Sequence, residues 1–296
     1  MNDGSRSGQG HYTRRPRTRE FFGLVHQILP LGSGALQSTD AIQVDGQSDF
    51  ISWGRAATYQ DGQVKIRFER VPGKMDASRP YFISGLGSGR FPNYYPQPLS
   101  ITRGTTYTLW ADDRRLVAGT TNIRILHIGQ KSFDRPFESA KLYTWAEPDR
   151  LIADFTAQDP IGALASGDSL QYPVLVSSEY DFDVAKIVVL CDGPGLVDIE
   201  TTGKALRWFN RACHSDLLGA SAFNAAATAG EWPFRLPSPV MVPSSGVILV
   251  TVTDLTVSPT YPNRVQVMFD GIKLGPARGL PIAESQLKLR MEGAGR

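Results

Sequence analysis

The segment Val64-Lys65-Ile66-Arg67-Phe68 alternates apolar and basic residues, which places the two kinds of side chain on opposite sides of an extended chain. This period of two is typical of a β-strand with one buried and one solvated face. The 29 glycines and 20 prolines separate several such short runs. Alternation, or enrichment in β-branched and aromatic residues, recurs in residues 41–44, 106–111, 123–128, 186–191, 196–199, 247–252 and 265–269. The pattern predicts an all-β protein made of antiparallel sandwiches of jelly-roll or related Greek-key type.

Short motifs occur twice in the same order, which predicts a tandem duplication. The offset between the copies is 130 to 132 residues at first and 142 after an insertion in the second copy. The matched pairs are Phe21-Phe22 with Leu151-Ile152, Leu29-Pro30-Leu31-Gly32 with Asp159-Pro160-Ile161-Gly162, Asp49-Phe50 with Asp181-Phe182, Gly104 with Gly246, and Gly129-Gln130-Lys131 with Gly271-Ile272-Lys273. A period this long is not that of a solenoid, so each copy should close its own core.

We therefore expect two tandem jelly-roll-like β-sandwich domains with flanking segments. The predicted parts are an extended basic N-terminal arm (1–18), a first sandwich (19–133), a linker (134–148), a second sandwich (149–275) and a C-terminal tail (276–296). Within the second sandwich, Leu206, Phe209, Cys213 and Leu217 have helix-like spacing and precede Gly219. This spacing predicts a short helix between residues 201 and 219, followed by a loop over residues 222–230.

The charge of the chain is concentrated at its start. Thirty-one basic and 29 acidic residues leave a net charge of +2, which argues for no particular charged partner. Residues 1–19, however, contain five arginines and one aspartate, Asp3, and so carry 5 − 1 = +4. No segment approaches the roughly 18 apolar residues of a membrane span, and no signal peptide is expected. The two cysteines, Cys191 and Cys213, are predicted to be reduced, buried thiols.

The basic arm is the feature whose charge suggests a partner. Residues 1–18 have no hydrophobic period, so we expect an extended, mobile segment that is ordered by contact with another surface. The predicted assembly contacts are Tyr12, Arg14, Arg15, Arg17 and Arg19. Guanidinium groups bind carboxylates of an adjacent subunit in a bidentate manner, and they also neutralise phosphates. We favour a subunit contact over nucleic acid, and a solvated tail is the remaining alternative.

Other candidate motifs predict no catalytic, cofactor-binding or metal-binding residue. Gly85-Leu86-Gly87-Ser88-Gly89-Arg90 resembles a phosphate loop but precedes Phe91-Pro92 rather than a helix, so a flexible loop is expected. Glu179, Asp181 and Asp183 are spaced to share one strand face, which is expected to be solvated rather than to hold calcium. The cysteines and the four histidines lack the spacing of a zinc site, and no Gly-x-Ser-x-Gly elbow is present. His127 aligns with Phe269, which favours a packed ring over a catalytic base.

The two units resemble those of a family of bacteriophage virion proteins. The resemblance covers most of residues 19–275 and rests on the order of five motifs: Phe21-Phe22, Leu29-Pro30-Leu31, Ser48-Asp49-Phe50, Pro237-Ser238-Pro239 and Gly271-Ile272-Lys273. Each copy departs from the pattern, since the first ends in Gly129-Gln130-Lys131 and the second has Tyr180 before Asp181-Phe182. The resemblance implies a non-enzymatic structural role in a phage particle.

The resulting expectation is a capsid-associated virion protein, made in the host cytoplasm, that contacts copies of itself and other virion proteins and no membrane. A minor capsid or decoration protein is favoured, and a shell-forming double jelly roll is the first alternative. The second is a carbohydrate- or receptor-binding tail module that would use the rings of Trp53, Tyr94, Tyr95 and Trp232. A hydrolase on a sandwich scaffold comes last.

Overall fold

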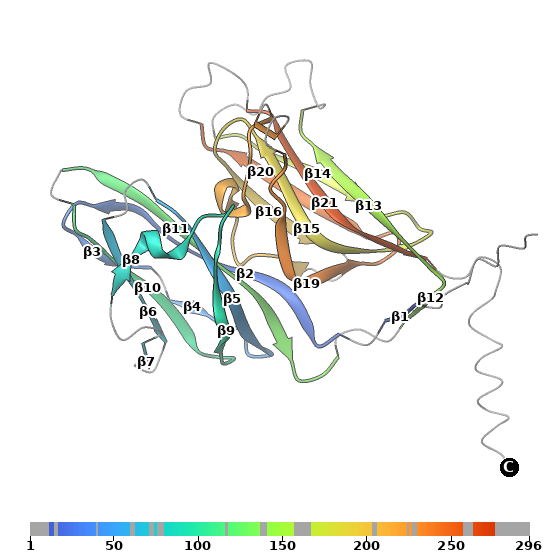
Figure 1. Ribbon diagram of the computed structural model, residues 1–296, viewed down its shortest axis with the longest axis horizontal. Coiled ribbons are helices and arrows are strands. Elements are labelled where there is room, and N and C mark those ends of the chain that lie inside the picture. Colours follow the sequence, from blue (N-terminus) through green and yellow to red (C-terminus); the bar gives the residue numbers. More distant parts are fainter. Residues whose placement is uncertain are drawn as a thin grey trace, which may run out of the picture.

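The computed structural model describes residues 12–14, 17–39, 41–59, 63–70, 74–75, 80–115, 118–136, 141–156, 167–202, 206–223, 225–226, 230–256 and 263–275. These residues form two β-sandwiches that lie side by side (Figure 1). The first contains β2 (Arg19–Gly32), β3 (Leu36–Ser38), β4 (Ile42–Gln43), β5 (Ser48–Thr58), β6 (Val64–Arg70), β7 (Lys74–Met75), β8 (Tyr81–Phe82), η1 (Ile83–Leu86), β9 (Asn93–Ile101), β10 (Thr106–Asp113) and β11 (Thr120–Phe133). The all-β prediction is confirmed.

The second sandwich starts inside the range predicted as a linker. Its first strand, β13 (Trp145–Asp154), begins three residues before the predicted end of the linker at 148. The other elements are β14 (Ser169–Leu175), β15 (Asp181–Cys191), β16 (Gly195–Thr201), β17 (Leu206–Arg207), β18 (Cys213–His214), η2 (Ser215–Leu218), β19 (Phe234–Val242), β20 (Val247–Asp254) and β21 (Val265–Gly275). A separate two-stranded ladder joins β1 (Tyr12–Arg14) to β12 (Lys141–Tyr143).

The two sandwiches have the same strand order. In the first, the sheet β2-β11-β5-β9 faces the sheet β3-β10-β6-β7, and in the second β13-β21-β15-β19 faces β14-β20-β16-β17. Taken in chain order, β2, β3, β5, β6, β7, β9, β10 and β11 of the first half occupy the same sheet positions as eight strands of the second half. Those strands are β13, β14, β15, β16, β17, β19, β20 and β21. In each half, two antiparallel sheets with four principal strands each therefore face each other in the strand order of a jelly roll, and β4, β8 and β18 pair beside these strands.

The register also repeats, down to a β-bulge. Ser52 of β5 pairs with Gly129 of β11, and the register then shifts so that Gly54 pairs with Ile128. In the second half Val184 pairs with Gly271, and Lys186 then pairs with Asp270. These pairs lie at offsets of 132 and 142 residues, as the repeated motifs predict. A Cβ atom on Gly129 would meet Phe50, and one on Gly271 would meet Phe182, so each glycine makes room for the matching ring.

The offset predicted for the opening strand is wrong by three residues. Leu24 pairs with His127, and Leu151 pairs with Phe269, which stands 142 residues after His127. Leu151 is therefore the counterpart of Leu24, at an offset of 127, and not of Phe21. The sequence match failed here because both strands are rich in apolar residues, so that several alignments are equally good. The proposed match of Leu29–Gly32 with Asp159–Gly162 lies partly outside the described residues.

The helix predicted between residues 201 and 219 is also misplaced. The described part of this segment forms the short strands β17 and β18, which pair with β16, and the four-residue 3₁₀ turn η2. Gly219 follows η2 with φ 74°, the left-handed conformation that ends a helical turn. Helical residues lie instead at 223, 225 and 226, where a loop is predicted. Of the four apolar residues at helix-like spacing, Phe209, Cys213 and Leu217 are buried in the core of the second half, and Leu206 is partly buried against it.

Three strands of one sheet in the first sandwich, β2, β5 and β11, have buried residues on both faces. Leu24, Phe50 and Ile125 face the core between its two sheets. Phe21, Val25, Ala56, Leu126 and Ile128 point the other way and belong to the core of the second half. Six consecutive residues of β11, 125–130, are buried, so this strand lacks the period of two. The apolar core of the second half therefore extends onto the outer face of this sheet.

The junction between the halves is completed by residues 208–210. The Gly23 amide donates to the Trp208 carbonyl (2.8 Å), and the Asn210 amide donates to the Gly23 carbonyl (3.2 Å). Phe209 is fully buried and packs edge-on against Phe21, with ring centroids 5.7 Å apart. The backbone of the second half thus extends the hydrogen bonding of β2 and covers its outer edge.

Candidate assembly surface

The base of the arm is anchored to the second sandwich through Arg17. Its guanidinium group donates two hydrogen bonds from Nη2 to the carboxylate of Asp183, at 2.8 and 2.7 Å, and one from Nη1 to the Pro239 carbonyl. Both side chains of the pair are about one-sixth exposed, at 16% and 17%. Burial raises the pKa of Asp183, and the charge and hydrogen bonds of Arg17 partly offset this rise. A desolvated pair of this kind fixes where the arm leaves the globular part.

A second acidic centre lies beside the arm at Asp181. Its carboxylate accepts hydrogen bonds from Lys141 Nζ (2.7 Å), the Tyr143 hydroxyl (2.7 Å) and the Ser244 amide (2.8 Å). Burial pushes the pKa of Asp181 upward, but the hydrogen bonds from these three groups outweigh it, so the pKa lies below its usual value. Lys141 and Tyr143 belong to β12, which pairs with Tyr12–Arg14 of the arm. Asp181 thus fixes the strand against which the arm lies.

The five predicted assembly residues fall in different settings. Arg17 is tied to Asp183, and Arg19 is exposed, with its carbonyl accepting a hydrogen bond from Ser238 Oγ (3.3 Å). The backbones of Tyr12 and Arg14 pair with Tyr143 and Lys141. The side chains of Tyr12 and Arg14, and the whole of Arg15, lie outside the described residues. The structure therefore brings Arg17 and the backbone of Tyr12–Arg14 together with β12 and β15 of the same chain.

The expectation that Glu179, Asp181 and Asp183 form a solvated comb is wrong for two of the three. Asp181 is buried, Asp183 is partly buried, and only Glu179 is exposed. Their spacing along a strand indicates water or calcium as their partner, and it does not indicate the arginine-rich arm of the same chain. Opposite charge on the two segments was the available signal. It could not be decisive, because 166 residues separate Arg17 from Asp183.

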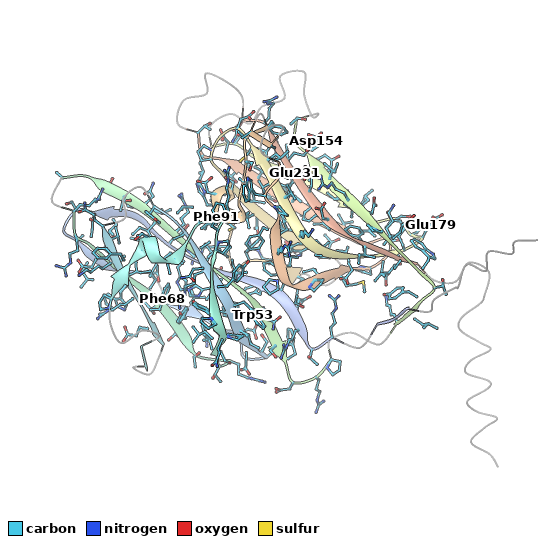
Figure 2. All side chains as sticks on the ribbon, in the orientation of Figure 1. Trp53, Phe68, Phe91, Asp154, Glu179 and Glu231 are labelled. Carbon is cyan, nitrogen blue, oxygen red and sulfur yellow. The ribbon has the colours of Figure 1, made fainter. Side chains whose placement is uncertain are left out.

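The aromatic residues proposed for glycan binding do not form one platform. Tyr95 lies under the buried Arg55 guanidinium at 5.0 Å, and Trp53 is only partly exposed. Trp232 packs edge-on against Phe91, with an interplanar angle of 66°. Phe91 is 65% exposed and Tyr94 is 50% exposed. Figure 2 shows Phe91 near the junction of the two halves and Trp53 farther down the first sandwich.

The glycine-rich loop 85–90 is a packing element. Leu86 ends the turn η1, and Gly87 has φ 77°, a conformation that favours glycine. A Cβ atom on Gly89 would collide with the backbone of Asp216 and Leu217 in η2. Arg90 donates to the Ala220 carbonyl (2.9 Å). This loop therefore joins the first sandwich to η2 of the second.

The thiols and histidines are set apart from one another. Cys191 and Cys213 are free and buried. Burial raises the pKa of Cys191 to about 11 and raises that of Cys213 further. Within the described ranges, no group of three or more His, Cys, Asp or Glu side chains could hold a metal ion. Among those same residues, no helix is long and apolar enough to cross a membrane.

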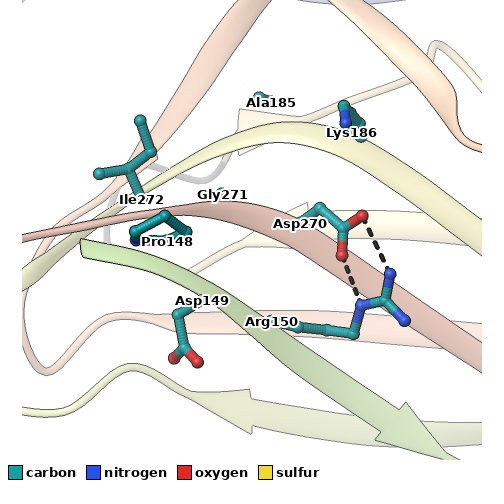
Figure 3. Close-up of a pocket in the computed structure, with 8 residues that line it drawn as sticks. All are labelled: Pro148, Asp149, Arg150, Ala185, Lys186, Asp270, Gly271 and Ile272. Carbon is teal, nitrogen blue, oxygen red and sulfur yellow. Dashed lines mark hydrogen bonds and ion pairs between the residues drawn. The ribbon is translucent and has the colours of Figure 1, made fainter.

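A shallow hollow of about 520 Å³ lies on the outer face of the second sandwich, and Figure 3 shows it. Arg150 crosses it and binds Asp270 (2.6 and 3.1 Å) and Glu231 (3.0 and 2.8 Å). The strand registers make Arg150 the counterpart of Gly23 and Asp270 the counterpart of Ile128. In the first half, the sheet face at these positions is apolar and packs against the second half. The equivalent sheet face of the second half carries a charged network instead.

No protein-family model matches the sequence, and no curated protein matches it. Solved structures with some similarity include a peptide-N(4)-(N-acetyl-beta-D-glucosaminyl) asparagine amidase, with a TM-score of 0.24 and 8% identity over 90% of this chain and 96% of that one. Another is a structure of the Gt strain of infectious bursal disease virus, with a TM-score of 0.20 and 10% identity over 95% of this chain and 85% of that one. TM-scores and sequence identities this low establish neither a common family nor a shared activity.

Proposed function

We propose that this protein is a non-enzymatic structural component of a bacteriophage virion, associated with the capsid as a minor capsid or decoration protein. The observation that carries the proposal is the combination of two jelly rolls, packed together through an apolar sheet face of the first, with a basic arm fixed at its base. A fused pair of sandwiches presents broad sheet faces and variable loops while its packed core keeps its shape. Repeated contacts of moderate strength suffice for such a protein when many copies assemble symmetrically.

The arm would provide the contact with neighbouring copies or companion proteins. Arg17 and Asp183 hold the root of the arm, which leaves the arginines before it to bind acidic groups on an adjacent subunit. Arg17 is thus the anchor within the chain, and the arginines before it make the proposed contact with another subunit. Nucleic acid remains the alternative partner, since the same arginines could neutralise phosphates.

A shell-forming double jelly roll is the second candidate. It is favoured by the repeated strand order and by the bulge that occurs at the same register in both halves. Two equivalent sandwiches in one chain could give three subunits approximate six-fold symmetry. The same repetition supports an origin of the chain by tandem duplication.

Two measurements test the proposal. Quantitative mass spectrometry of purified particles should find the protein, with hundreds of copies for a shell or decoration protein and a dozen or fewer for a tail or vertex protein. Absence from particles would refute the virion role.

Deletion of residues 1–16 removes the arm but keeps the Arg17 anchor. We expect a folded protein that no longer enters the assembly, with a melting temperature lowered only by the loss of the short β1–β12 ladder. The matched control is Arg114→Ala, which removes an exposed arginine paired with Asp112 and should leave both properties unchanged. Normal incorporation of the deletion variant would exclude a tethering role for the arm.

A further inference from the structure

The core of the first sandwich contains a cluster of buried polar and ionisable side chains. His26 of β2 and His127 of β11 are fully buried, and their ring centroids lie 5.4 Å apart. Arg55 of β5 is 5% exposed, donates from Nη2 to the Tyr107 hydroxyl (3.0 Å) and lies over the ring of Phe68 at 4.3 Å. Figure 2 places Phe68 inside the first sandwich.

The imidazoles of this cluster are surrounded mainly by rings. Phe68 lies edge-on to His127 at 4.7 Å and to His26 at 5.7 Å. Neither ring nitrogen of His26 has a hydrogen-bond partner among the residues that the structure describes. Arg55 Nε lies 3.4 Å from His127 Nδ1 and donates toward it, so that nitrogen must stay unprotonated. The polar and charged groups that face the two imidazoles are Ser52 and Arg55 from β5 and Tyr107 from β10, and the charge of Arg211 from the second half also acts on His26.

The second sandwich shows that the jelly roll does not require this cluster. The strand registers make Phe269 the counterpart of His127, and Ile187 the counterpart of Arg55. The counterpart of His26 is Ala153. All three of these residues are buried in the apolar core of the second half. The same fold is therefore closed once with apolar residues and once with two histidines and an arginine.

The electrostatic setting opposes protonation of either histidine. Burial lowers the pKa of His26 to about 3, and the positive charges of Arg211 and Arg55 add to this effect. The pKa of His127 is lowered well below its usual value by burial, by Arg55 and by His26. An unfolded histidine titrates near pH 6.5. Because the folded pKa values are depressed, the stability of the fold is complete above about pH 6.5 and decreases as the pH falls toward the folded pKa values.

We propose that the first sandwich is an acid-responsive element, which opens when His26 and His127 take up protons while the second sandwich stays closed. A charge on either ring would stand beside Arg55 in a desolvated core, where like charges repel strongly. Opening the sandwich lets water solvate the new charges. The effect of acid would spread to the junction, because the sheet that carries both histidines also covers the second half.

The test is the pH dependence of unfolding of the full chain in urea. Between pH 7 and pH 5, each buried histidine should raise the unfolding equilibrium constant about 25-fold, or about 600-fold for the pair. Two substitutions, His127→Phe and His26→Leu, should each remove about one 25-fold factor from this pH dependence. Phenylalanine is the residue found at the position equivalent to His127 in the second half. His214→Gln, in the second half, serves as the control and should leave the factors from the first half intact. A double variant as acid-sensitive as the natural chain would overturn the proposal.

Two measurements on the natural chain remain informative if a variant fails to fold. At pH 5, hydrogen exchange should accelerate in peptides from residues 19–133, beyond the intrinsic effect of pH, and not in those from β14 (169–175) and β20 (247–254) of the second half. In nuclear magnetic resonance spectra, the Cε1–H signals of both histidines should stay at neutral-ring positions until the first sandwich opens. A titration near pH 6.5 in the folded protein, or uniform exchange in both halves, would refute the mechanism. Neither readout depends on the virion role.

Discussion

The contact between Gly23 and Phe209 can be tested by combining Gly23→Ala with Phe209→Ala. In the natural chain, a Cβ atom on residue 23 would overlap the ring of Phe209 and lie 2.9 Å from Leu126 Cδ1. Overpacking of this kind costs about 1–3 kcal/mol. Phe209 is fully buried and packs against Phe21, so its truncation to alanine should cost about 3–5 kcal/mol.

The double variant should be more stable than the sum of the two single changes predicts. Once the Phe209 ring is absent, the two shortest contacts of the added methyl group are gone, the next is with the flexible end of Leu126, and the methyl group partly fills the space. The coupling energy should therefore favour the double variant by about 1–3 kcal/mol, against the roughly 0.5 kcal/mol that separate sites show. Urea unfolding of all four proteins, followed by circular dichroism, measures this energy.

The control cycle pairs Phe209→Ala with Gly129→Ala. The added methyl group at residue 129 would meet Phe50 and the Ile51 carbonyl (2.6 Å) on the opposite face of the sheet, so the two changes should be additive. Additivity in the Gly23 cycle as well would refute the reasoning, because it would mean that Phe209 does not lie against β2.

Further expectations concern the thiols and Asp181. Cys191 and Cys213 should not react with a thiol reagent at pH 8 within the lifetime of the folded state, and both should react in denaturant, because burial raises their pKa values; rapid labelling of the native protein would contradict this. Asp181→Asn should lower the free energy of unfolding at pH 7 by about 1–3 kcal/mol, since three hydrogen bonds to a charged group are weakened. Because the folded pKa of Asp181 is depressed, its stabilisation is present above about pH 4 and lost below it. The free energy of unfolding of the variant should therefore fall less steeply as the pH is lowered into the acid range. Asp112→Asn, at a more exposed ion pair, should change stability by less than about 1 kcal/mol, and an equal loss in both variants would argue against a special role for Asp181.

The sequence reveals individual strands where one of their faces meets solvent. Val64, Ile66 and Phe68 are buried and alternate with half-buried Lys65 and Arg67, as the opening motif predicts. The same rule fails for β11, because its second face is covered by the other half of the chain. No local pattern distinguishes that strand from a helix or from a loop with buried residues.

Only part of the candidate site could be predicted from the sequence. The basic arm stands out by its charge, and the carboxylates at 181 and 183 by their spacing. Their pairing with Lys141 and Arg17 joins residues 40 and 166 positions apart, and neither spacing nor composition encodes such a contact. Arg17, which the sequence placed among the contacts to another subunit, is bound within its own chain.

The amino-acid sequence by itself determined the all-β class and the repeated order of strands, because side-chain alternation and turn residues act over a few neighbouring positions. The tertiary structure decided how the two sandwiches dock, where Phe209 lies and what the histidines meet. Those outcomes depend on which sheet faces come together. That choice is made by the packing of surfaces distant in sequence, and the apolar residues concerned look alike before they are brought into contact.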